Sequence, residues 1–396
     1  MIRILYVITD LLIGGAEVML SKLLFRIDRS VFQPIVVSLG TMGELGHLIT
    51  EMGIPVLALY IDSPIKASPA LIKLLKIVRR YKPHLVHTWM YYADLLGGLA
   101  ARIGGVRSVV WCIRNYNLDK DKTKFLTRTV ARVCGLLSNL VPTCIVSCSR
   151  LAIDVHVSMG YSINKFVVIP NGFDLSLFKP DNEAKKKIRQ QLRIDLNTPL
   201  VGMIARFDPH KNHLGFIEAA GMVHREMPDV HFLLAGNGVD ENNLQLLKLI
   251  DSKGLRNVTY LLGLRRDVPQ LMAALDLLVS FSHGEAFPNV VGEAMACGVP
   301  CIVTDVGDCS YIVGDTGRVV IPGDSNSLAL AIKEVISLPL NIRMELGKRA
   351  RARVKEEFSI ENIVHRYEEL YKEIIRNSTP KPMYSDRGFL YNKVRN

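Results

Sequence analysis

The stretch from Asp276 to Asp305, DLLVSFSHGEAFPNVVGEAMACGVPCIVTD, constrains the fold more than any other part of the chain. Its apolar run, residues 277–281, has the length and the Leu and Val content of a strand buried on both faces. After a polar loop, Pro288 and Asn289 mark the start of a short helix, which Gly298 ends before a second strand begins. A strand, a loop, a helix and a strand in this order make half of a parallel α/β unit.

Two glutamates lie on either side of the predicted helix start. The N–H groups at Asn289 and Val290 and the partial positive charge of the helix terminus suit a phosphate or diphosphate. Glu293 would lie roughly 6 Å further along, at about 1.5 Å rise per residue, where a carboxylate can hold the two hydroxyls of a ribose. Glu285 lies on the other side of the diphosphate site, so the order matches sugar, diphosphate and ribose in a nucleotide sugar. The alternative is that both glutamates simply face solvent.

These residues closely resemble the E-x7-E signature of the group-1 retaining glycosyltransferases of family 4, and the resemblance covers Arg3 to about Ile375. It implies an α/β chain of the GT-B architecture. Two Rossmann-like domains would have parallel sheets facing a central cleft, and the C-terminal helix would cross back to the first domain. In that family the first glutamate lies beside the transferred sugar and the second binds the ribose, and these positions are Glu285 and Glu293 here.

A chain of 396 residues is long for one core and suits two domains. Strand and helix patterns alternate through most of it, which predicts mostly parallel sheets. We expect an acceptor-binding domain at residues 1–175, completed by a helix at about 360–376. The resemblance places a donor-binding domain at residues 176–358, and residues 377–396 read as a flexible tail.

The glycines of the Gly14-Gly15-Ala16-Glu17 segment follow the first predicted strand and precede a helix expected from about Val18. Paired glycines there let the backbone approach a ligand closely, although an ordinary tight turn would look the same. The sequence lacks G-x-G-x-x-G at this point, which disfavours NAD. The group-1 enzymes have a very similar GGAE segment, which faces the donor, so the resemblance makes Gly14 and Gly15 candidate binding residues.

Three further candidates follow later strands of the first domain. His87 lies near the carboxyl end of a strand expected at residues 84–88, where ligands bind in parallel sheets. We predict that it lines the acceptor site as a catalytic residue, although a single histidine is more often structural. Arg114 and Asn115 lie at the next strand end. Many relatives have a catalytically important histidine near this place, and this sequence has Arg114 instead.

The second domain contributes cations and a loop glycine. Arg206 and Lys211 lie five apart after a strand at residues 200–205, and such a pair can clamp two phosphates. They match the phosphate-binding Arg and Lys of the family. Gly236 ends another strand, and Arg265 lies in the loop where relatives hold the base.

The net charge of +11 is unevenly distributed. Residues 1–172 carry 20 Lys and Arg against 10 Asp and Glu, whereas the remaining chain carries 29 against 28. Nucleic acid, an anionic membrane or an acidic substrate would each suit the basic half. Basic side chains recur along a helix expected at residues 70–81, and every fourth residue from 120 to 132 is basic: Lys120, Lys124, Arg128 and Arg132. Such surfaces are either solvated helix faces or docking sites for anionic lipid.

Several classes of protein are disfavoured. We expect no signal peptide, since Met1 leads directly into a strand-like run, and no apolar run reaches the about 18 residues of a membrane span. The seven cysteines read as reduced core thiols of a cytosolic protein, with spacings poor for zinc. No D-x-D metal site is evident, and Arg206 and Lys211 can do the work of a metal, so we expect no metal and no cofactor. No nucleic-acid module is visible either.

The sequence therefore predicts a retaining glycosyltransferase, hexosyl- or N-acetylhexosaminyl-transferring, that uses a UDP- or GDP-sugar. We expect a lipid-linked glycan acceptor of cell-surface polysaccharide synthesis, such as capsule or O-antigen. The enzyme would be cytoplasmic and peripheral at the inner face of the membrane, attracted by anionic lipid. Two alternatives stay open: a sugar-nucleotide epimerase of the same fold, which needs no acceptor, and a non-catalytic basic binding protein.

Overall fold

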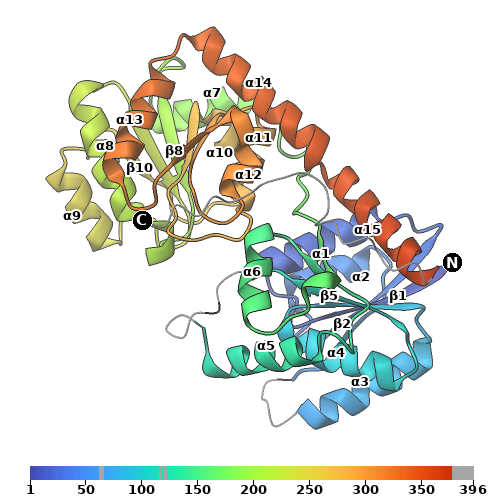
Figure 1. Cartoon of the computed structure of the whole chain (residues 1–396). Coiled ribbons are helices and arrows are strands. Elements are labelled where there is room, and N and C mark those ends of the chain that lie inside the picture. Colours follow the sequence, from blue (N-terminus) through green and yellow to red (C-terminus); the bar gives the residue numbers. More distant parts are fainter. Residues whose placement is uncertain (62–66, 116–117, 119–122, 377–396) are drawn as a thin grey trace. The chain divides into compact units, whose positions relative to one another are not determined.

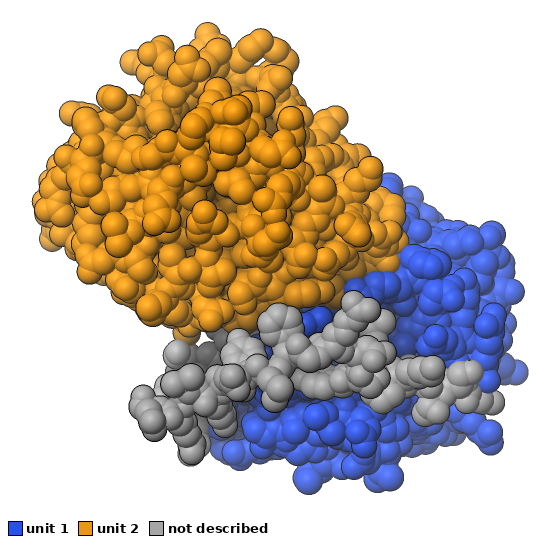
Figure 2. All heavy atoms as spheres, turned by 45° about the horizontal axis from the view of Figure 1, so that its top comes forward, with its two compact units in different colours: residues 1–169, 364–396 blue, residues 170–363 orange. Residues whose placement is uncertain are grey.

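The computed structural model describes residues 1–61, 67–115, 118 and 123–376. The chain divides into two compact units, coloured separately in Figure 2: residues 1–169 with 364–396, and residues 170–363. The predicted tail at 377–396 lies outside the described residues, as does Lys120, the first of the four regularly spaced basic residues.

Among the described residues, unit 1 forms a seven-stranded sheet in the order β3-β2-β1-β4-β5-β6-β7, and every pairing is parallel. Its strands are β1 (Ile2–Ile8), β2 (Phe32–Ser38), β3 (Val56–Ala58), β4 (Leu85–Trp89), β5 (Ser108–Ile113), β6 (Cys144–Ser147) and β7 (Phe166–Val168). The central strands are buried along almost their whole length because helices cover both faces, which explains their continuous apolar runs.

The helices of unit 1 are α1 (Gly15–Arg26), α2 (Gly43–Glu51), α3 (Ala67–Tyr81), α4 (Tyr91–Ile103), α5 (Phe125–Leu137), α6 (Arg150–Ser158) and, from Val364 on, α15 (Ile360–Ile375). Helices α3, α4 and α5 lie side by side along one face of the sheet (Figure 1). Leu5 and Val7 of β1 pack in the core on that side. Tyr6, between them, points to the opposite face because strand side chains alternate, and there it contacts Tyr371 of α15.

Among the described residues, unit 2 forms a six-stranded parallel sheet in the order β10-β9-β8-β11-β12-β13. Its strands are β8 (Leu200–Ile204), β9 (His231–Ala235), β10 (Thr259–Leu261), β11 (Leu277–Ser280), β12 (Cys301–Thr304) and β13 (Arg318–Val320). The core contains Phe216 and Phe232, whose rings meet edge to face with centroids 6.1 Å apart.

The helices of unit 2 are α7 (Asn182–Leu192), α8 (His213–Glu226), α9 (Leu244–Ser252), α10 (Val268–Ala274), α11 (Asn289–Ala296), α12 (Cys309–Val313), α13 (Ser325–Ile336) and α14 (Leu340–Glu357). Helices α8, α9 and α13 pack together on one face, and α7, α10, α11 and α14 on the other (Figure 1). A short 3-10 turn, η3 (Pro209–Lys211), lies between β8 and α8.

Two all-parallel sheets with helices on both faces confirm the predicted fold class of two Rossmann-like units. The packing of α15 on unit 1 agrees with the predicted return of the C-terminal helix. One boundary is wrong: α1 begins at Gly15 and not near Val18, because Gly14, in extended backbone, is already the N-cap residue. No helix in the described part of the chain is long and apolar enough to cross a membrane.

Candidate active site

The strand order of unit 2 reverses between β8 and β11, which are neighbours in space but not in sequence. In open parallel sheets, ligands bind beyond the carboxyl ends of the strands at such a point. The segment after β8 carries Arg206 and Lys211, and the loop after β11 carries Glu285. The Lys211 ammonium and Glu285 Oε1 form a close ion pair, and these side chains are 22% and 12% exposed. Two predicted site residues, far apart in sequence, therefore meet at the switch point.

Hydrogen bonds fix the loop that carries Glu285. The N–H of His283 donates to the carbonyl of His210 (2.7 Å), which ties this loop to the segment after β8. Thr304 Oγ1 donates to the carbonyl of Ser282 (2.7 Å) from the end of β12. The hydroxyl of Ser282 then donates to Glu285 Oε1 (2.7 Å). The carboxylate is therefore oriented by a short loop that hydrogen bonds hold in place.

Helix α11 starts directly after this loop, with Pro288 as its N-cap residue. Asn289 and Val290 are in its first turn. As at every helix start, their N–H groups have no hydrogen-bond acceptor within the helix. The side chain of Asn171 donates to Asn289 Oδ1 (2.8 Å) and holds this residue from the beginning of unit 2. Glu293 lies one turn further along and is half-buried.

Packing behind α11 explains the glycine within this helix. A Cβ added to Gly292 would lie 2.1 Å from Cζ of Phe173, so only glycine lets the ring sit there. The ring of Phe173 also stacks on that of Phe287, with centroids 6.2 Å apart and planes 19° apart. The stacked rings of Phe173 and Phe287 therefore help to fix the position of the helix start.

Arg206 is exposed, and its Nε donates to Asp208 Oδ2 (3.2 Å). Partial burial raises the pKa of Asp208, but the N–H of His210 and the Arg206 guanidinium outweigh this effect and hold that pKa below its usual value. Asp208 therefore stays charged at neutral pH and directs the guanidinium along the loop.

Gly236 and Arg265 lie at the carboxyl ends of β9 and β10. Gly236 has a φ of +153°, and a Cβ there would lie 2.0 Å from the carbonyl oxygen of Ala205, so the loops after β8 and β9 touch. Its N–H donates to the carbonyl of Gly263 (2.8 Å). Arg265 makes two hydrogen bonds to Asp267, of 2.7 and 2.5 Å. The loops after four neighbouring strands thus form one edge of unit 2.

Unit 1 has its own switch point, where β1 and β4 lie side by side. Gly14 and Gly15 follow β1 and start α1. A Cβ on Gly14 would lie 2.4 Å from Glu17 Oε2, whereas a Cβ on Gly15 would meet no atom within 4 Å. Packing therefore does not demand glycine at position 15, and the backbone there is open to a ligand.

His87 lies within β4, and its side chain is fully buried under α15. Its Nδ1 is 2.8 Å from the hydroxyl of Tyr371, and the ring of Tyr6 lies 5.6 Å away. Among the described residues, its Nε2 has no hydrogen-bond partner. Burial, with a smaller effect from the charge of Arg114, holds the pKa of His87 well below its usual value, so the ring is neutral. The predicted catalytic role of His87 stays a prediction.

Arg114 lies just beyond the end of β5 and is tied to the C-terminal helix. Its Nη2 donates to the hydroxyl of Tyr367 (2.5 Å), and its guanidinium carbon lies 4.5 Å from the centre of the Trp89 ring. Asn115 follows it and is half-buried. The cation that replaces the histidine of many relatives is thus held by an aromatic ring and a tyrosine hydroxyl.

Sequence reasoning missed the residues that support the predicted ones. Ser282 lies three residues before Glu285, and a hydroxyl that close to a candidate acid in a loop was a usable signal. Tyr367 and Tyr371 lie four apart, so they face the same side of α15. Nothing in the sequence connects them with His87 or Arg114.

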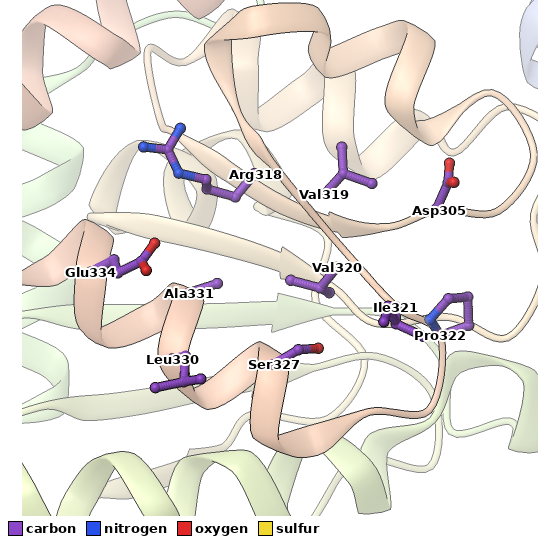
Figure 3. Close-up of a pocket in the computed structure, with 10 residues that line it drawn as sticks. All are labelled: Asp305, Arg318, Val319, Val320, Ile321, Pro322, Ser327, Leu330, Ala331 and Glu334. Carbon is purple, nitrogen blue, oxygen red and sulfur yellow. The ribbon is translucent and has the colours of Figure 1, made fainter.

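A hollow of about 560 Å³ lies elsewhere on unit 2, between β13 and α13 (Figure 3). Val319, Ile321 and Leu330 line it, and none of the predicted site residues does. It lies against an edge strand and not at the switch point, so we do not assign the site to it. Among the residues that the structure describes, no group of three or more His, Cys, Asp or Glu side chains is placed to hold a metal ion.

Comparison with known proteins gives consistent similarities. A model of the glycosyl transferases group 1 matches residues 184–353, and a model of Glycosyltransferase Family 4 matches residues 13–177. A UDP-Gal:alpha-D-GlcNAc-diphosphoundecaprenol alpha-1,3-galactosyltransferase of Escherichia coli is 29% identical over 324 residues, covering 80% of this chain and 82% of that protein. The capsular polysaccharide biosynthesis glycosyltransferase CapM of Staphylococcus aureus is 26% identical over 324 residues, covering 79% and 82%.

Solved structures are similar over nearly the whole chain. Anabaena Alr3699/HepE in complex with UDP has a TM-score of 0.82 and 26% identity, covering 94% of this chain and 100% of that one. The same protein in complex with UDP-glucose has a TM-score of 0.79.

Proposed function

This chain belongs to the group-1 glycosyltransferases of family 4, and we propose that it transfers a sugar from a nucleotide-diphosphate donor to an acceptor hydroxyl with retention of anomeric configuration. Its two parallel-sheet units are those of the GT-B fold. The observation that carries the proposal is the meeting of Lys211, Glu285 and the start of α11 at the switch point of unit 2.

Breaking the anomeric C–O bond leaves negative charge on the diphosphate and positive character on the sugar. The ammonium of Lys211, the guanidinium of Arg206 and the N–H groups at the start of α11 would stabilise the first charge, and they are already in place before reaction. The carboxylate of Glu285 would orient the sugar and stabilise the second charge. These cations supply what a metal supplies elsewhere, so we propose a metal-independent reaction.

The remaining donor contacts follow the edge formed by the loops of unit 2. Glu293 would hold the ribose hydroxyls, one helical turn beyond the diphosphate. The backbone at Gly236 and the loop that carries Arg265 would border the donor. The nucleotide base would lie against the Arg265 loop. The UDP and UDP-glucose complexes of the Anabaena protein support a UDP-sugar as the donor to test first.

Unit 1 would bind the acceptor, through the open backbone at Gly15 beside Gly14 and through Arg114 and Asn115. Since His87 is buried, we propose that it packs beneath the acceptor site and helps to hold its shape. The Escherichia coli relative acts on a sugar linked to diphosphoundecaprenol, and the Staphylococcus relative serves capsular polysaccharide synthesis. The first similarity supports a lipid-linked acceptor, and the second supports a role in the synthesis of a cell-surface polysaccharide.

A lipid-linked acceptor requires the enzyme to work at a membrane, and α5 offers a surface for this. Lys124 and Arg132 are exposed there, and Arg128 is half-buried. Phe125 and Leu136 on the same helix are 83% and 78% exposed. Exposed apolar side chains beside basic ones suit the interface of an anionic bilayer. We propose peripheral attachment at the inner face of the cell membrane.

A binding and transfer assay tests the function. Thermal shifts with UDP, GDP and other nucleotide diphosphates identify the base, because a bound ligand stabilises the folded chain by mass action. The matching nucleotide sugars are then offered with a polyprenyl-diphosphate-linked sugar, and product linkage is read by NMR. Transfer with retention is the expected result. Turnover of the sugar nucleotide to an isomer without acceptor would favour the epimerase, and no nucleotide binding would favour a non-catalytic protein.

A further inference from the structure

The carboxylate of Glu285 is held at one of its two oxygens. Lys211 Nζ and Ser282 Oγ both donate to Oε1. No described residue donates to Oε2. A carboxylate has about four acceptor positions, so this arrangement leaves the second oxygen available to a ligand.

Ser282 is itself fixed. The residue is 2% exposed, and its carbonyl accepts the hydrogen bond from the buried Thr304. On the other side, Gly307 has a φ of +56°, and a Cβ there would lie 2.1 Å from the carbonyl oxygen of Glu285. The loop backbone is therefore confined from two directions, which holds the Ser282 hydroxyl within hydrogen-bond distance of Glu285 Oε1.

The second hydrogen bond to Glu285 Oε1 matters because Lys211 would also have to bind the donor. The proposed function requires its ammonium to bind the diphosphate, and an ammonium has three N–H donors to divide between ligands. With Lys211 alone, any shift of the ammonium toward the phosphates would release the carboxylate. The neutral hydroxyl of Ser282 has no such competing ligand and keeps Oε1 in place.

We propose that Ser282 is a positioning residue for sugar transfer: it fixes Oε1 of Glu285 so that Oε2 faces the reacting sugar while Lys211 engages the diphosphate. This inference rests on the proposed function. Because Ser282 acts through Glu285, its removal should lower kcat and leave nucleotide binding unchanged. A misplaced catalytic group costs about 10²-fold in rate.

The first test compares Ser282→Ala and Ser282→Thr with the wild-type chain. We expect kcat to fall about 10²-fold in the alanine variant, with the affinity for the nucleoside diphosphate unchanged, and to recover in the threonine variant, which keeps the hydroxyl. Thr316→Val is the control, since it removes another buried hydroxyl of unit 2, one that donates to the carbonyl of Val313 (2.7 Å). Its kcat should equal the wild-type value.

The second test is a double-mutant cycle under single-turnover conditions. If Ser282 acts through Glu285, Ser282→Ala should cause no further loss in a Glu285→Ala background. Equal losses in both backgrounds, or wild-type kcat in Ser282→Ala, would overturn the inference while leaving the transferase function intact. A wild-type chain that transfers sugar from no nucleotide sugar would instead refute the proposed function.

Discussion

Replacement of Lys211 by alanine tests the proposed chemistry most directly. The Lys211 side chain is 22% exposed and its ammonium pairs with Glu285, so it lies where the diphosphate leaves the sugar in the proposed reaction. Alanine removes the cation but leaves the carboxylate its hydrogen bond from Ser282 (2.7 Å). The loop should therefore keep its shape, and the effect should fall on the reaction more than on the fold.

The size of the effect follows from how the charge on the diphosphate changes. A donor aimed at charge that develops in the transition state contributes about 2.7–4 kcal/mol, which corresponds to about 10²–10³ in kcat. In the proposed ground state the diphosphate would also meet Arg206 and the start of α11, and one charged hydrogen bond contributes about 1.5–3 kcal/mol. We therefore expect kcat to fall more than the affinity for the donor, because interactions with the leaving group strengthen during the reaction.

The assay measures kcat, KM and nucleotide affinity for Lys211→Ala beside a matched control. Lys333→Ala is suitable, because Lys333 is also in unit 2, is 21% exposed and pairs with Glu226 (2.8 Å) on other helices. The control should retain wild-type kinetics. Wild-type kcat in Lys211→Ala, or an activity lost only on adding a chelator, would mean that a metal neutralises the diphosphate and that the reasoning is wrong.

Three further changes test other parts of the structure. Glu293→Ala should weaken nucleotide diphosphate binding by about 1.5–3 kcal/mol in calorimetry, and unchanged affinity would remove Glu293 from the site. Gly236→Ala should lower the free energy of unfolding in urea by more than Gly254→Ala does. Both glycines have a positive φ, but only at Gly236 would the added Cβ meet a carbonyl oxygen. Equal losses of stability would contradict this. Lys124→Glu with Arg132→Glu should reduce co-sedimentation with anionic vesicles at low salt, at about 1 kcal/mol per residue. Recovery in the supernatant for wild type under all conditions would reject membrane attachment.

Local chemistry in the sequence predicted the elements that carry the donor-site candidates of unit 2 well. Proline and asparagine before an apolar run are strong helix-start signals, and α11 begins at Asn289 as expected. The post-strand positions of Lys211 and Glu285 were visible too, because both follow short, strongly apolar strands. Their direct pairing was not predictable, since it depends on β8 and β11 being neighbours, and strand order is a tertiary property. The start of α1 was misplaced because paired glycines look like a loop even where one of them begins a helix.

The surroundings of the candidates in unit 1 were less predictable, because they depend on a helix at the other end of the chain. His87 follows apolar residues in a strand, and alternation alone places it on one face of the sheet. Whether that face is open or covered depends on α15, whose Tyr367 and Tyr371 reach Arg114 and His87. This contact also limits what Arg114 can do, because a guanidinium between Trp89 and a tyrosine hydroxyl is held in one place. Arginine also keeps its proton at any physiological pH, so Arg114 cannot act as a general base. Any role of Arg114 toward the proposed acceptor is therefore one of charge and position.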